Sequence, residues 1–137
     1  MLIAALTLIA LSPAAEPSAA EMLHGLDMTS FRNSLQPSRT PQRKRPADWL
    51  FTVASTDGRA ASLTRYDSGG HEDWVIGLKI IRREADGAVA CFSDQALGHA
   101  RYRAYSAIRI VSDGTGGYTV AAQDLDEPSC RPAPGQG

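Results

Sequence analysis

The chain has 137 residues, of which 43% are hydrophobic and 21% charged, and its formal net charge at pH 7 is −1. This length suits a single domain with a modest core, and a charge so near zero gives no reason to expect nucleic acid or an acidic membrane surface as a partner. Only Lys44 and Lys79 are lysines among the 14 basic residues. Together with the abundant alanine, this indicates GC-rich coding of a bacterial kind.

Residues 1–20 have the pattern of a signal peptide. An almost unbroken apolar run over 2–11 leads to the small residues Ser18-Ala19-Ala20, an order typical of a cleaved export signal. The run is shorter than the roughly 20 apolar residues that span a bilayer. No basic residue precedes it, so either the signal is short or translation starts upstream. We expect cleavage after Ala20, with a cut after Ala14 as the alternative, and a periplasmic or secreted protein with no stable membrane anchor after cleavage.

Residues 21–46 are expected to form a short helix followed by a linker rich in proline and arginine. Asp27 can cap a helical turn in which Met28 and Phe31 share one face. Three prolines and several basic residues then fill 36–46, which favours a solvated segment over a packed one. These basic side chains are either simply hydrated or a contact for an acidic partner.

Residues 47–123 show the period of two that β-strands have. Turn signals interrupt this pattern at Asp57-Gly58, Asp67–Gly70, Asp86-Gly87 and Ser112–Gly117. Strands that alternate with such turns are typical of a meandering antiparallel sheet or a small barrel-like domain. We therefore predict a mainly β (or α+β) fold with a short N-terminal helix. The run Asp94–Arg103 fits either a helical turn or an irregular crossing.

Residues 124–137 are expected to form a loose tail that Cys130 pins to the sheet. Cys91 and Cys130 are the only cysteines, and an oxidising compartment lets a bond between them persist. Closing the loop of about 39 residues between them stabilises a fold by roughly 4 kcal/mol in the chain-entropy model. The alternative, a nucleophilic Cys91, requires a free thiolate, and no Cys–His motif surrounds this residue.

No motif for a metal or a cofactor stands in the sequence. Neighbouring side chains on a strand point to opposite faces, so His71-Glu72-Asp73 does not suit one ion. The run 113–124 lacks the glycine and the glutamate that a calcium loop places at its sixth and twelfth positions. Phosphate loops, dinucleotide loops and nucleophile elbows are missing as well. We expect neither a metal nor a cofactor.

A basic stripe is the candidate binding surface, and it consists of Arg101, Arg103, Tyr105 and Arg109. On an extended strand these side chains share one face, and guanidinium groups near an aromatic ring suit anionic sugars or phosphates. The alternative is the hydrated outer face of a sheet. We expect Arg103 and Arg109 to be exposed and Ile108 and Ile110, on the opposite face, to be buried.

Three functions remain open. The absence of a catalytic motif favours a non-enzymatic binding or interaction domain, for another protein or an anionic glycan. An inhibitor of a cell-wall or host enzyme would present the loop Asp67–Asp73. A small hydrolase would use His71 or His99 with nearby carboxylates. A concave pocket that holds both histidines favours the hydrolase, whereas a protruding loop favours the inhibitor.

Overall fold

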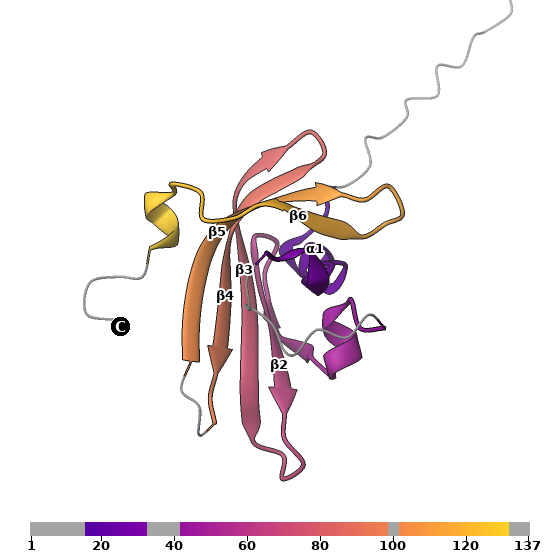
Figure 1. Ribbon diagram of the computed structural model, residues 1–137, viewed down its shortest axis with the longest axis vertical. Coiled ribbons are helices and arrows are strands. Elements are labelled where there is room, and N and C mark those ends of the chain that lie inside the picture. Colours follow the sequence, from indigo (N-terminus) through magenta and orange to yellow (C-terminus); the bar gives the residue numbers. More distant parts are fainter. Residues whose placement is uncertain (1–15, 33–41, 99–101, 132–137) are drawn as a thin grey trace, which may run out of the picture.

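The computed structural model describes residues 16–32, 42–98 and 102–131, and their centre is a six-stranded antiparallel sheet (Figure 1). Its strands are β1 (Thr52–Thr56), β2 (Ala60–Tyr66), β3 (Glu72–Glu84), β4 (Gly87–Ala96), β5 (Tyr102–Ser112) and β6 (Tyr118–Ala122). Each strand pairs with the next one along the chain. The predicted mainly β meander is therefore confirmed, and the sheet stays open.

Short helices lie on both sides of this sheet. They are α1 (Ala19–His24) and the 3-10 helices η1 (Met28–Ser30), η2 (Pro46–Trp49) and η3 (Pro128–Cys130). Figure 1 shows α1 and η2 on one side of the sheet, here called the inner face, and η3 on the other, the outer face. In the described ranges no helix has the length and apolar character needed to cross a bilayer.

The inner face holds the hydrophobic core. Side chains that alternate along the central strands are at most 2% exposed, namely Leu63, Ile76, Leu78, Ile80, Phe92, Ile108 and Ile110. Met22 and Leu23 of α1 complete this layer, and Phe31 packs on Phe92 with ring centroids 4.7 Å apart. The isoleucine pair of β5 thus faces inward, as its alternation predicts.

The segment just before α1 is part of the packed fold. Ser18 caps the helix, because its hydroxyl accepts a hydrogen bond from the Glu21 amide at 3.2 Å. Ala19 is fully buried. Arg83 of β3 holds Glu16 in an ion pair of 3.0 Å and also donates to the carbonyl of Pro17. Residues of the predicted signal peptide therefore contact the core and the sheet.

The predicted cap at Asp27 is present, but it begins a 3-10 turn. The carboxylate of Asp27 accepts from the Thr29 amide at 2.9 Å, and the turn ends at Ser30. Helix α1 lies before it and ends at His24 with Gly25 as its C-cap. The helical segment is thus two short pieces, separated at the glycine that lowers helix stability.

Arg45 ties the region before β1 to the turn between β5 and β6. Its guanidinium donates to the carbonyl of Gly25 and lies 3.4 Å from a carboxylate oxygen of Asp113. The other oxygen of Asp113 accepts from Thr115, whose hydroxyl and amide are 2.7 and 2.8 Å away. These donors, the hydroxyl first, lower the pKa of Asp113 to about 2.

Candidate binding site on the outer face

A disulfide fastens the C-terminal segment to the outer face. Cys91 of β4 and Cys130 of η3 are joined with an S–S distance of 2.07 Å, so the predicted bond is confirmed and Cys91 is not a free thiolate. The segment is held upstream as well, because the Leu125 amide donates to the Ala107 carbonyl at 3.0 Å. Arg82 of β3 pairs with Glu127.

One row of the outer face carries small polar side chains across neighbouring strands. The register pairs Ser55 with Ser62, Ser62 with Gly77, Gly77 with Ser93, and Ser93 with Tyr105. Adjacent strands lie about 4.8 Å apart, so this row runs for roughly 20 Å across the sheet. Its small side chains form a low floor, and Tyr105 stands at one end.

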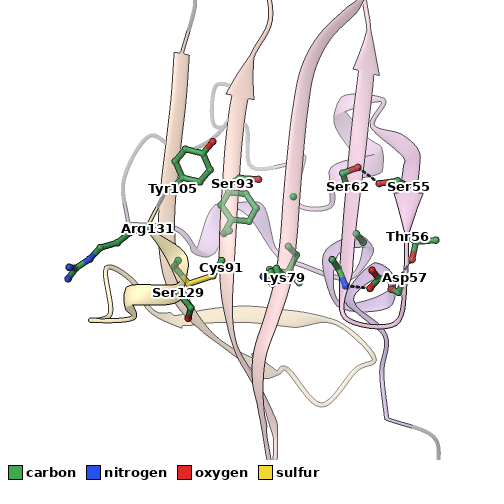
Figure 2. A pocket seen from close by; sticks show the side chains of 16 residues that line it. Ser55, Thr56, Asp57, Ser62, Lys79, Cys91, Ser93, Tyr105, Ser129 and Arg131 are labelled. Carbon is green, nitrogen blue, oxygen red and sulfur yellow. Dashed lines mark hydrogen bonds between the residues drawn. A yellow bond between two sulfur atoms is a disulfide. The ribbon is translucent and has the colours of Figure 1, made fainter. Parts of the chain in front are cut away.

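A hollow of about 530 Å³ lies on this row, and we call it the outer trough (Figure 2). Besides the row itself, its lining includes Asp57 next to β1, Lys79 of β3, and Ser129 and Arg131 beside the disulfide. The volume falls in the range of pockets that hold small ligands. Strands far apart in the sheet and the tethered tail therefore build one concave surface.

Three polar groups in the outer trough are open to a ligand. The hydroxyls of Ser93 and Tyr105 and the ammonium of Lys79 make no hydrogen bond or ion pair with any residue that the structure describes. Lys79 is exposed and Tyr105 is 41% exposed. By contrast, the hydroxyls of Ser55 and Ser62 bond to each other at 2.9 Å. The trough therefore offers two hydroxyls and one cation to a ligand.

Gly77 keeps the middle of the floor low. A Cβ atom at this position would lie 2.5 Å from the hydroxyl oxygen of Ser93, so any side chain there displaces Ser93. Glycine inside a central strand often marks such a close approach. This glycine was the available sequence signal for the trough. The serines gave no separate signal, because their alignment depends on the register between strands.

One residue of the predicted basic stripe, Tyr105, lines the outer trough. The register places Arg103, Tyr105 and Arg109 on the outer face, opposite Gln95, Ser93 and Val89, but Tyr105 is the member that lines the trough. Arg103 is exposed, as expected. Arg101 lies outside the described residues, so the prediction for its side chain stays a prediction.

Arg109 is less exposed than expected, and its charge is paired. Its side chain is 39% exposed, and its Nε atom lies 2.9 Å from a carboxylate oxygen of Glu84. The cause is an irregularity in β3 between Ile80 and Arg82, which shifts the alternation and sets Glu84 beside Arg109. The charge of Arg109 is therefore already paired with a carboxylate of the same sheet.

Of the two candidate histidines, His71 is the one that the structure describes. His71 lies in the turn between β2 and β3, its side chain is 82% exposed, and its nearest carboxylate is Asp67 at 3.5 Å. His99 lies outside the described residues. Within the described ranges no three metal-ligating side chains cluster together.

A buried carboxylate lies on the inner face, away from the outer trough. Asp94 of β4 is fully buried. One of its oxygens accepts a hydrogen bond from the Trp74 indole, and the other has no hydrogen-bond partner among the residues that the structure describes. Burial raises the pKa of Asp94. Burial and the charge of Asp94 also raise the pKa of Tyr102.

Comparisons of the chain with protein-family models, curated proteins and solved structures give no match. The outer trough is therefore interpreted from its own geometry and chemistry.

Proposed function

We propose that this protein is an exported, non-enzymatic binding domain that takes its ligand in the outer trough. The observation that carries this proposal is that Ser93, Tyr105 and Lys79 line one hollow of about 530 Å³ and form no hydrogen bond or ion pair with the described residues. Binding pockets commonly combine a concave surface with a few polar groups that orient the ligand. The disulfide adds support, because it fixes one border of the trough before any ligand arrives.

The chemistry of the lining favours binding over catalysis. Asp57 is the carboxylate residue of the described lining, and its side chain accepts from the amides of Arg59 and Ala60 at 2.8 and 2.7 Å. These bonds, that of Arg59 first, lower the pKa of Asp57. A general base works best when its pKa lies near the operating pH, so Asp57 is poorly suited to activate a hydroxyl.

Export is supported by the disulfide, which persists in oxidising compartments. We propose a cleavage site after Ala14 instead of Ala20. Ser12 and Ala14 supply the small residues at the two required positions, and this cut keeps the contacts of Glu16 and the cap at Ser18. The protein would then act in the periplasm or outside the cell.

A blocked trough tests the binding function. In Ser62→Trp a bulky ring fills the middle of the row, whereas Ser68→Trp places the same ring on an exposed turn outside the trough. Both variants and the parent are heated with a library of saccharides, amino acids, organic acids and nucleotides. A ligand at about 100 times its dissociation constant stabilises the folded state by roughly 2.7 kcal/mol.

We expect at least one compound class to raise the melting temperature of the parent and of Ser68→Trp, but not of Ser62→Trp. Equal stabilisation of all three proteins would place the site elsewhere. A library without any stabilising compound would also overturn the proposal.

One observation favours a second candidate, an enzyme inhibitor. The turn Asp67–His71 is exposed at the end of the β2–β3 hairpin, and Asp67 accepts from the amides of Gly69 and His71 at 2.8 and 3.0 Å. A preorganised loop loses little entropy on binding. The test is inhibition of a panel of cell-wall hydrolases and secreted proteases. An inhibitor would weaken in Asp67→Ala and stay potent in Ser62→Trp.

A further inference from the structure

We infer that the ligand of the outer trough is an acidic oligosaccharide, with a carboxylate at Lys79 and a sugar ring on Tyr105. This inference rests on the proposed binding function and specifies its ligand class. It follows from three properties of the trough: its row of hydroxyls, the exposed ammonium of Lys79 and the separation of that ammonium from Tyr105.

The row of hydroxyls suits a chain of sugar units. Serine and tyrosine hydroxyls both donate and accept hydrogen bonds, as the hydroxyls of a sugar do. The strands repeat Ser55, Ser62 and Ser93 across the trough at multiples of about 4.8 Å. The hydroxyls of Ser55 and Ser62 bond to each other but keep lone pairs that can accept from a ligand. A ligand that repeats polar groups along its length can therefore pair with them as well as with Ser93.

The charge of the trough suits one carboxylate. Lys79 is exposed and has no carboxylate within ion-pair distance among the described residues. It interacts at longer range with Asp57, whose pKa it helps to lower and whose carboxylate already accepts from two backbone amides. The ammonium can therefore take an anionic ligand without breaking a hydrogen bond. Arg131 at the border is bound to Asp126 at 2.9 Å, and Figure 2 shows its side chain pointing away from the row. Lysine acts as a compact point charge, which matches a single acidic group.

The separation of the two contacts sets a minimum ligand length. Lys79 lies on β3 and Tyr105 on β5, so two strand spacings, about 10 Å, separate their positions across the sheet. A chain of two or more sugar rings spans this separation without requiring either side chain to lean toward the other. Tyr105, at 41% exposed, offers a ring face on which an apolar sugar face packs. The ligand is therefore a disaccharide or longer.

Calorimetry with three probes tests this inference. The probes are trigalacturonic acid, the neutral maltotriose and monomeric galacturonic acid. We expect the acidic trimer to bind the parent at least tenfold more tightly than either of the others. In Lys79→Gln the acidic trimer should lose about tenfold or more in affinity, as expected for a hydrogen bond to a charged group. Lys44→Gln, the matched control at the other lysine, should bind like the parent.

A direct readout follows the Lys79 side chain in the parent protein, and the variants serve only to assign its signal. Reductive methylation with ¹³C-formaldehyde labels both lysines and keeps their charge, and the two variants assign the two side-chain signals. Trigalacturonic acid should shift the Lys79 signal and leave the Lys44 signal in place. Equal shifts of both signals, or none, would contradict a carboxylate at Lys79.

The failures of this inference and of the proposed function are distinguishable. Saccharide binding that Ser62→Trp abolishes but Lys79→Gln leaves unchanged would overturn the acidic ligand and retain the trough. Saccharide binding that Ser62→Trp leaves unchanged would overturn both. If none of the three probes binds, the saccharide assignment is wrong, and the compound library alone decides whether the trough binds another class.

Discussion

Asp94 is the fully buried carboxylate of the described chain, with one donor for its two oxygens. Because burial raises its pKa in the folded protein, the folded state holds this proton more tightly than the unfolded chain does. Stability therefore falls as the pH rises from the ordinary value of 3.8 through the raised one. Asp94→Asn cannot ionise, so we expect urea titrations to show its stability, relative to the parent, increasing toward neutral pH.

Asp113→Asn is the control with the opposite sign. The pKa of Asp113 is lowered to about 2, so its stabilising contribution is complete above 3.8 and is lost as the pH falls through about 2. Asp113→Asn removes this charge and should therefore lower the free energy of unfolding at neutral pH. If the stability of Asp94→Asn relative to the parent does not change with pH, burial does not raise the pKa of Asp94.

Gly117 occupies a position where a side chain would collide with the ion pair between Arg45 and Asp113. A Cβ atom there would lie 2.4 Å from an Arg45 nitrogen and 2.6 Å from an Asp113 oxygen. Gly117→Ala must therefore displace the ends of these two partly exposed side chains, and we expect a loss of at most about 1 kcal/mol, the usual worth of a surface ion pair. Gly58→Ala is the matched control, because nothing lies within 4 Å of its added Cβ. Denaturant unfolding of both variants checks the prediction, and equal stabilities would contradict it.

Helix η3 depends on the disulfide for its place beside the outer trough. In the double variant Cys91→Ser/Cys130→Ser we expect a loss of about 2–4 kcal/mol in unfolding free energy. The sheet should keep its circular dichroism, because the strand pairs that build it do not include η3. Ligand affinity should also fall, since Ser129 and Arg131 border the trough.

Reductant separates this effect from a packing defect at the two serines. It should lower the stability of the parent to that of the double variant and leave the variant itself unchanged. A parent that reductant does not destabilise would show that the remaining contacts of the segment, such as the Leu125 amide on Ala107, hold it without the bond.

Local sequence patterns predict the strands and turns of this protein well, because Asp-Gly pairs and a period of two act over a few residues. They do not predict the outer trough, which requires the register between strands that aligns Ser62, Gly77 and Ser93. The irregularity in β3 that pairs Glu84 with Arg109 is equally invisible in an alternating pattern. Register and strand irregularities are set by packing across the sheet, which a single strand does not encode.

The start of the folded chain is ambiguous in sequence for a related reason. Small residues such as Ser18 and Ala19 suit a cleavage site, but they also suit a helix cap and a tight contact with a sheet. The structure uses them in the second way, with Ala19 fully buried and its amide 3.3 Å from the Gly58 carbonyl. The described fold thus includes contacts of residues 16–20, which the sequence pattern assigns to the leader.

This segment yields a test on the complete fold, in which chains that start at residue 15 and at residue 21 are compared. The shorter chain lacks the Ser18 cap, worth about 1 kcal/mol, and the buried Ala19 side chain. It also places a charged amine at Glu21, within α1, where the positive end of the helix dipole disfavours it. We expect denaturant unfolding to show the shorter chain at least 2 kcal/mol less stable, the sum of the cap and the lost apolar burial.

The control is Arg83→Gln in the longer chain. It should reproduce only the part of this stability loss that comes from the contacts of Arg83 with Glu16 and Pro17. Equal stability of the two chains would mean that residues 15–20 are dispensable, and cleavage after Ala20 would then be compatible with the folded protein.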